Sequence, residues 1–140
     1  MIIAIDGPAG SGKTTIARLL ANKLGILYLD TGATYRVLTL RALEEKIDLN
    51  NEDKLAQLAK SLNILFKNGR VFIGSRDVTE EIRDPIIDKS ISMPVSFNKV
   101  RKEMVDIQRS IARGKDTAVE GRDITTVVFP RAEHKFYLDA

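Results

Sequence analysis

Residues 7–14 read G-P-A-G-S-G-K-T and fit the phosphate-binding pattern GxxxxGK[ST] without a gap. Glycines let the backbone turn where a Cβ would clash, so that loop amides can point inward at a polyphosphate. Lys13 adds a full positive charge for the β- and γ-phosphates, and the Thr14 hydroxyl can complete the ligand shell of Mg²⁺. The alternative interpretation is a glycine-rich turn that binds nothing.

The segments on either side of this loop supply the context that the pattern needs. The β-branched, apolar run at residues 2–5 predicts a buried parallel strand. After the loop, apolar residues recur at helical spacing up to Leu24, and Gly25 is typical of a helix end. The predicted order is strand, glycine loop and helix, with the positive end of the helix dipole toward the phosphate. This order favours phosphate binding over a plain turn.

Two further polar clusters follow predicted strands. A short strand at residues 28–30 leads into D-T-G-A-T-Y-R, where Thr31 is expected to cap a helix reaching about Lys46. A second strand at residues 117–119 leads into E-G-R-D. Because ligands of open α/β sheets bind beyond the carboxyl ends of the strands, we expect both clusters and the glycine loop to meet in one crevice. Taken alone, each cluster also fits a capped surface helix or a solvated turn.

Strands alternate with helices along most of the chain, which predicts an α/β fold with a parallel sheet and helices on both faces. The exception is a hairpin at residues 64–67 and 70–73, joined by Asn-Gly, which suits a type I′ turn. We interpret residues 48–92 as an insert beside the sheet. Residues 135–138 are the last predicted strand. The predicted helix signals are caps at Asn51, Asp84 and Ser96, an interruption at Pro94 and a stop at Gly114.

Composition sets the broad class of the protein. The chain has 140 residues, 44% of them hydrophobic and 29% charged, which fits one globular domain. The net charge of +3 is too small and dispersed for a nucleic-acid surface, so no nucleic-acid partner is expected. The absence of cysteine and the single histidine, His134, argue against disulfides and a zinc site. No apolar run reaches ~18 residues and no leader precedes the first strand, so we expect a cytoplasmic protein without a membrane partner.

Five stretches in this order and spacing resemble bacterial cytidylate (CMP) kinases: GPAGSGKTT, LDTGATYR, EEIR, the VR pair at residues 100–101, and EGRDITTVVFP. The resemblance covers residues 3–139, and its second and last stretches are far more specific than the glycine loop alone. It implies a P-loop NTPase-type fold in which residues 48–92 form the nucleoside-monophosphate-binding insert. It also implies transfer of the γ-phosphoryl group of Mg²⁺·ATP to CMP or dCMP.

The resemblance assigns roles to individual residues. The implied catalytic residues are Lys13, Arg36 and Arg122, acting by positioning and charge neutralisation. Thr14 would reach the Mg²⁺ that comes with ATP. The implied ATP-binding set is Gly7, Pro8, Ala9, Gly10, Ser11, Gly12, Lys13, Thr14 and Thr15. The implied CMP-binding set is Thr31, Tyr35, Arg36, Ser92, Arg101, Arg122 and Asp123, with Arg36 and Arg122 on the phosphate and Ser92, Arg101 and Asp123 on the cytosine edge.

The sequence departs from the family pattern in two places. Thr125 stands where the family commonly has glycine, and a β-branched residue resists positive φ, so we expect a slightly different turn. The chain also ends just after the predicted strand at residues 135–138, whereas the family continues through an arginine-bearing lid and a last core strand. We therefore interpret residues 1–140 as one truncated P-loop kinase domain. We expect weak nucleotide binding, little turnover and self-association, where the full-length protein would be a monomer.

Two alternatives stay open beside this interpretation. One is a kinase of the same architecture for another small acceptor, such as UMP, AMP or shikimate. If CMP is the acceptor, loss of Ser92, Arg101 and Asp123 should erase the preference for cytosine. The other alternative is a non-catalytic nucleotide-binding fragment, because the lid is missing; a turnover assay distinguishes it.

Overall fold

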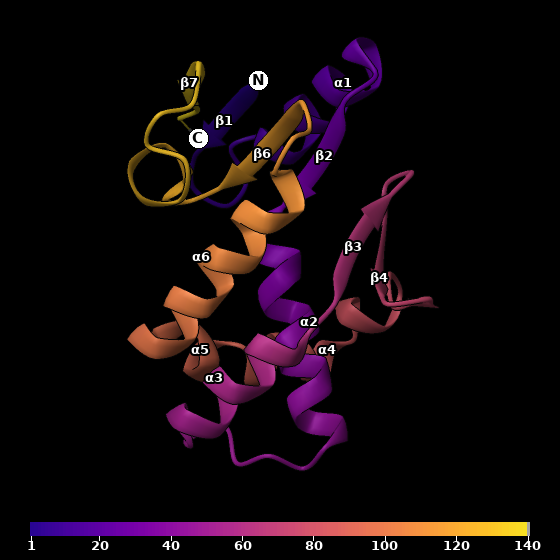
Figure 1. The fold of residues 1–140 in the computed structure, drawn as a ribbon, viewed down its shortest axis with the longest axis vertical. Coiled ribbons are helices and arrows are strands. Elements are labelled where there is room, and N and C mark those ends of the chain that lie inside the picture. The colour runs from indigo at the N-terminus through magenta and orange to yellow at the C-terminus, as the bar shows by residue number, and fades with distance from the viewer. Residues whose placement is uncertain (140) are drawn as a thin grey trace. The chain divides into compact units, whose positions relative to one another are not determined.

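The computed structural model describes residues 1–139, which separate into two compact units. The first unit contains Met1–Thr31 and the chain from Gln108 onward, and the second contains Gly32–Ile107. Figure 1 shows the elements in chain order, coloured from the N-terminus to the C-terminus. No helix among residues 1–139 is long and apolar enough to cross a membrane.

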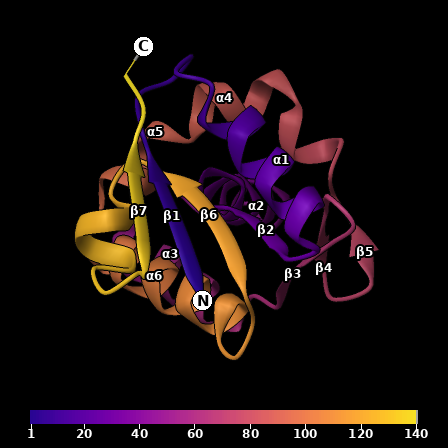
Figure 2. The same cartoon turned by 90° about the horizontal axis from the view of Figure 1, so that it is seen from above.

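The first unit is built on a parallel sheet of four strands in the order β2-β6-β1-β7 (Figure 2). The strands are β1 (Ile2–Asp6), β2 (Leu27–Asp30), β6 (Thr117–Gly121) and β7 (His134–Tyr137), which confirms the four predicted strands. β1 and β6 are almost wholly buried because each has a neighbour on both sides. The fold is therefore the predicted α/β fold, with a parallel sheet flanked by helices.

The edge strand β7 differs from the two central strands, because all four of its residues are exposed. Phe136 and Tyr137 are its large exposed side chains. An exposed strand edge is a place where a second chain can pair. The self-association expected from the sequence stays a prediction.

The register of the strands brings their carboxyl ends level with one another. Asp6 at the end of β1 pairs with Gly121 at the end of β6, and Asp30 at the end of β2 pairs with Glu120. The three strand ends therefore lie at one edge of the sheet, while the single crevice expected from the sequence stays a prediction. The glycine loop leaves β1 at this same edge.

Helix α1 (Lys13–Leu24) follows the glycine loop and packs on the sheet. Its Ala17 joins Ile3 and Ile5 of β1 in a buried cluster, against which Leu20, Ile26, Tyr28 and Leu138 pack. Gly25 ends the helix in the left-handed conformation, with φ of 65°, as predicted. The same unit contains η2 (Ile124–Val128), a single π-helical turn that sequence periodicity does not predict.

The second unit contains most of the helices. Helix α2 (Thr31–Glu44) begins with Thr31, which is assigned to the first unit, so Thr31 is the first residue of this helix and not the predicted cap ahead of it. The other elements are α3 (Glu52–Ser61), η1 (Glu81–Arg83), α4 (Pro85–Ser90), α5 (Ser92–Ser96) and α6 (Asn98–Ala112), whose last residues belong to the first unit. The buried residues of α6 are Val100, Met104, Gln108 and Ala112, which recur every four residues along one face of the helix.

An antiparallel sheet of three strands lies in the second unit, in the order β3-β4-β5. The predicted hairpin is formed by β3 (Ile64–Lys67) and β4 (Arg70–Ile73), with φ of 53° at Asn68 and 74° at Gly69. Two successive positive φ values are what a type I′ turn requires, so this prediction is confirmed. Strand β5 (Arg76–Asp77) was not predicted, because two residues are too few to show a period of two. The role of residues 48–92 as an acceptor-binding insert stays a prediction.

Of the helix caps predicted at Asn51, Asp84 and Ser96, the first two are confirmed and the third is wrong. Asn51 Oδ1 accepts the N–H of Lys54 at 3.1 Å, and Asp84 Oδ1 accepts the N–H of Ile86 at 3.0 Å. Ser96 is instead the last residue of α5, where its Oγ donates to Met93 O at 2.7 Å.

The N-terminus of α6 is capped by a residue from another helix. Glu52 Oε2 accepts the N–H of Lys99 at 3.1 Å, in the first turn of α6. Since 47 residues separate the two partners, the local sequence around Ser96 gives no sign of this contact.

The predicted interruption at Pro94 is also wrong. Helix α4 ends at Ser90, and Pro94 is the third residue of the next helix, α5. Proline is tolerated there because first-turn N–H groups have no partner within the helix.

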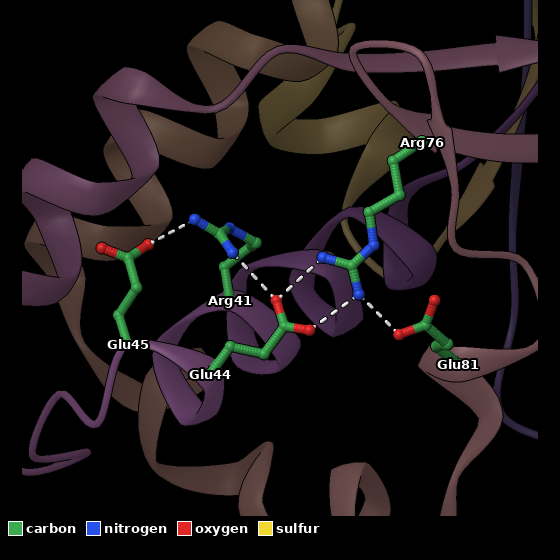
Figure 3. Close-up of polar contacts among 5 residues, drawn as sticks. All are labelled: Arg41, Glu44, Glu45, Arg76 and Glu81. Atoms are coloured by element: carbon green, nitrogen blue, oxygen red, sulfur yellow. Dashed lines mark hydrogen bonds and ion pairs between the residues drawn. The ribbon is translucent and has the colours of Figure 1, made fainter.

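A network of ion pairs joins the end of α2 to β5 and η1 within the second unit (Figure 3). Arg76 donates to both oxygens of Glu44, at 3.0 and 2.7 Å, and to Glu81 at 2.5 Å. Arg41 donates to Glu44 at 2.9 Å and to Glu45 at 2.8 Å. These contacts, Arg76 foremost, lower the pKa of Glu44 to about 2.

Glu44→Gln is expected to weaken the acid dependence of folding stability. Because the pKa of Glu44 is lower in the folded chain than in the unfolded one, its stabilisation is complete above its ordinary pKa of 4.5 and is lost as the pH falls toward 2. We expect Glu44→Gln to lower the free energy of unfolding by about 0.5–1 kcal/mol at pH 7, as for other surface pairs. Urea titrations from pH 7 to pH 2 measure this, with Glu45→Gln, which loses one contact with Arg41, as the control. Equal pH dependence in Glu44→Gln and the unsubstituted chain would contradict the prediction.

Candidate phosphate-binding site

The glycine loop between β1 and α1 uses its glycines for two different reasons. Gly10 and Gly12 have φ of 78° and 89°, a region that residues with a Cβ rarely adopt, and a Cβ on either would meet open space. Gly7 is buried, and a Cβ there would lie 2.7 Å from both Leu138 O and Ser11 Oγ. The expected clash of a Cβ therefore explains the glycine at position 7, whereas the positive φ explains the glycines at positions 10 and 12.

Lys13 and Thr14 begin helix α1 directly after this loop. The Nζ of Lys13 donates to Pro8 O at 3.2 Å, so its side chain reaches back across the loop. Ser11 N donates to the same carbonyl at 3.2 Å, and Ile16 N donates to Gly12 O at 3.0 Å. The amides ahead of Ile16 lie at the helix N-terminus, which is where proteins bind anions. Pro8, Ala9 and Thr15 are exposed on the same segment.

Glu120, which is not among the site residues predicted from the sequence, lies against the start of α1. Its Oε1 accepts the hydroxyl of Thr14 at 2.8 Å, and its Oε2 accepts the hydroxyl of Tyr28 at 2.5 Å. The residue is only 3% exposed, and this burial raises the pKa of the Glu120 carboxyl. Burial likewise raises the pKa of the Tyr28 hydroxyl. The sequence indicates Glu120 only through its position as the first residue of E-G-R-D, directly after an apolar strand.

The oxygen atoms at this corner fit a magnesium ion that arrives with a nucleotide. The Thr14 hydroxyl and the Glu120 carboxylate are hard oxygen donors 2.8 Å apart. Among residues 1–139, no group of three or more His, Cys, Asp or Glu side chains could hold a metal ion. Mg²⁺ commonly takes one or two protein oxygens and completes its shell with phosphates and water, and these two residues suit that mode.

Asp6, the last residue of β1, holds the start of η2. The carboxylate is 2% exposed and accepts the N–H of Ile124 at 2.8 Å and the N–H of Thr125 at 2.9 Å. It also accepts the hydroxyl of Thr125 at 2.6 Å. Thr125 does not adopt a positive φ, because the non-glycine residues with positive φ over positions 1–139 are Lys46 and Asn68. The expected difference between this turn and the turn of relatives with glycine stays a prediction. Threonine here adds a hydrogen bond that glycine would lack.

Thr125→Val is expected to lower the free energy of unfolding by about 1–3 kcal/mol, because a hydrogen bond to a buried carboxylate is lost. Valine keeps the β-branched shape, so packing changes little. Thr126→Val is the matched control, since the Thr126 hydroxyl is exposed and its contact with Asp123 O is 3.5 Å long. Urea unfolding of both variants checks the prediction. A loss no larger for Thr125→Val than for Thr126→Val would contradict it.

The predicted acceptor-binding residues divide between the two units. Arg36 of α2 pairs with Asp88 of α4 at 2.6 Å, and donates to Ile82 O at 3.1 Å. An acceptor phosphate on Arg36 would therefore bind a guanidinium that already pairs with the carboxylate of Asp88. Tyr35 lies in α2, and Ser92 and Arg101 are exposed at the start of α5 and in α6.

The first unit holds the other three residues of this set. The hydroxyl of Thr31 donates to Glu120 O at 2.9 Å, while Arg122 and Asp123 directly follow β6. The structure thus brings Thr14 and Thr31 together around Glu120. That Arg122 and Asp123 share one acceptor site with Arg36, Ser92 and Arg101 of the second unit stays a prediction.

Comparison with known proteins places this arrangement in a family. The family model of cytidylate kinase matches residues 3–140. The chain belongs to the cytidylate kinase family. A cytidylate kinase of Caldanaerobacter subterraneus subsp. tengcongensis is 49% identical over 138 residues, which cover 99% of this chain and 62% of that protein. A cytidylate kinase of Pelotomaculum thermopropionicum is 48% identical over 143 residues, which cover 99% of this chain and 63% of that protein.

Membership of the cytidylate kinase family confirms the resemblance found in the sequence. In Prochlorococcus marinus, a bifunctional pantoate ligase/cytidylate kinase is 48% identical over 144 residues, which cover 99% of this chain and 28% of that protein. The chain spans about 62% of the length of its Caldanaerobacter relative. The parallel sheet with its glycine loop is the P-loop fold expected of a nucleotide kinase of this family.

Proposed function

We propose that the protein is a nucleoside-monophosphate kinase that transfers the γ-phosphoryl group of ATP to CMP or dCMP. The observation that carries this proposal is the match of residues 3–140 to the cytidylate kinase family. The geometry of residues 7–14 supports it, because two left-handed glycines and Lys13 frame the N-terminus of α1. Residues 7–15 form the proposed ATP site.

The proposed chemistry is positioning and charge neutralisation. An oxygen of the acceptor phosphate forms a bond to the γ-phosphorus, and the bond from that phosphorus to the β-phosphate oxygen of ATP breaks. Lys13 and the first-turn amides of α1 bind the donor phosphates, while Arg36 and Arg122 neutralise the acceptor phosphate. When bound, Mg²⁺ offsets charge on the β- and γ-phosphates, and Thr14 with Glu120 would hold it.

Cytosine selection is assigned to Ser92, Arg101 and Asp123. A carboxylate can accept the amino group of cytosine, and an arginine can donate to its carbonyl. Uracil carries a carbonyl in place of that amino group, so a carboxylate would repel it. A site of this kind discriminates strongly, because the wrong base leaves polar groups unpaired. Within residues 1–139, no structural feature favours UMP, AMP or shikimate as acceptor.

A coupled assay for ADP release tests the proposal. It compares the 140-residue chain with the same chain completed by the carboxy-terminal segment of the Caldanaerobacter relative. We expect the completed chain to phosphorylate CMP and dCMP in preference to UMP and AMP, and the 140-residue chain to be much slower. Gel filtration of the two proteins tests the proposed self-association of the shorter one. A completed, folded chain that prefers AMP, UMP or shikimate would overturn the proposed acceptor.

A further inference from the structure

The carboxylate of Glu120 bridges two hydroxyl groups that come from different elements. Its Oε1 accepts from Thr14, in the first turn of α1, and its Oε2 accepts from Tyr28 of β2. The carboxylate is buried, on a strand with neighbours on both sides. Each carboxylate oxygen therefore holds one hydroxyl, and together they fix the plane of the carboxylate.

The direction of the Thr14 hydroxyl follows from this arrangement. A threonine hydroxyl has one proton to donate and two lone pairs. Because the proton is given to Glu120, the lone pairs are left for another partner, and a cation accepts lone pairs. A carboxylate held at one oxygen only could rotate about its last torsion, since such torsions are broad. The Tyr28 hydroxyl removes this freedom by holding the other oxygen.

Tyr28 is itself held in place from two sides. Its ring packs against the buried cluster that contains Ile3 and Ile5. The guanidinium of Arg18 lies over the ring, 5.2 Å from its centroid. Arg18 follows Thr14 by four residues on α1, so both residues lie on the same face of this helix.

We propose that Tyr28 is a positioning residue for Mg²⁺·ATP, acting through Glu120 to aim the lone pairs of Thr14 at the cation. The proposal rests on the proposed function, because it needs ATP on residues 7–15. It distinguishes Tyr28 from a side chain that only fills the core. Substitution of a side chain that only fills the core would change the affinities for ATP with and without Mg²⁺ alike. Substitution of a positioning residue would change the affinity for Mg²⁺·ATP alone.

Tyr28→Phe removes the hydroxyl and keeps the ring and its contact with Arg18. Calorimetric titration of the 140-residue chain with ATP, in Mg²⁺ and in excess chelator, measures the two affinities. We expect Tyr28→Phe to weaken binding of Mg²⁺·ATP about 5- to 10-fold, in the range of one hydrogen bond, and to leave metal-free ATP unchanged. The matched control is Tyr137→Phe, whose exposed side chain lies on β7. The same change there should alter neither affinity.

A double-mutant cycle with Thr14→Val separates positioning from packing. If Tyr28 acts through Thr14, adding Tyr28→Phe to Thr14→Val should cause no further loss of Mg²⁺·ATP affinity. Additive losses, or equal losses with and without Mg²⁺, would overturn the role of Tyr28 and leave the proposed function intact. Failure of the folded, completed chain to bind ATP at all would overturn the proposed function, and this inference with it.

Discussion

Lys13→Ala is expected to lower the affinity of the chain for ATP by about two orders of magnitude, because each hydrogen bond between a charged group and phosphate contributes about 1.5–3 kcal/mol. Folding should not change. The contact of the Lys13 amine in the structure is with Pro8 O at 3.2 Å, on the loop itself and not in the core. Titration calorimetry with ATP measures the binding loss, and urea unfolding measures stability.

Lys23→Ala is the matched control for this experiment. Lys23 is exposed in the last turn of the same helix, at the end away from the glycine loop. Its removal deletes the same charge from the same helix and should leave ATP binding nearly unchanged. Equal affinities for ATP in Lys13→Ala and Lys23→Ala would show that residues 7–14 are a turn and not a phosphate site.

Gly121→Ala is expected to lower the free energy of unfolding by about 3 kcal/mol, at the high end for an overpacked core. A Cβ at this position would lie 2.3 Å from Thr31 Oγ1 and 2.7 Å from the end of the Ile124 side chain. Neither side chain can move away without a loss of folding stability. Thr31 is hydrogen-bonded to Glu120 O at 2.9 Å, and Ile124, the first residue of η2, is fully buried.

Gly114→Ala is the control that separates crowding from backbone strain. Gly114 has φ of 70°, but a Cβ there would meet nothing within 4 Å. Alanine in that conformation costs about 1–2 kcal/mol. Urea unfolding should therefore show a clearly larger loss for Gly121→Ala. A smaller loss at Gly121 than at Gly114 would contradict the prediction, because it would mean that the side chains of Thr31 and Ile124 can move away from a Cβ at position 121 without loss of stability.

The parts of the fold that the sequence predicts are those with a local period or a local turn signal. β1 and α1 were predictable because an apolar run and a helical stripe flank the glycine loop. The β3-β4 hairpin was predictable because only residues tolerant of positive φ suit its turn, and Asn68-Gly69 supplies them. The short elements β5, α5 and η2 carry too few residues for a period to emerge.

The parts of the candidate site that the sequence did not predict depend on contacts between distant residues. Glu120 meets Thr14 across 106 positions, and Asp6 meets Thr125 across 119. No local pattern encodes such a pairing, because it arises only when β6 and η2 come beside the end of β1. The hydrogen bond from the Thr125 hydroxyl to Asp6 could not be predicted for the same reason.

The selectivity of the acceptor site tests the central claim most directly. The measurement is the ratio of kcat/KM for CMP to that for UMP in the completed chain, before and after Asp123→Ala. We expect the ratio to fall by about 5- to 150-fold, which corresponds to the roughly 1–3 kcal/mol cost of an unpaired polar group, while ATP binding is kept. Equal losses for CMP and UMP would contradict the account, because Asp123 would then be a structural residue of the turn after β6.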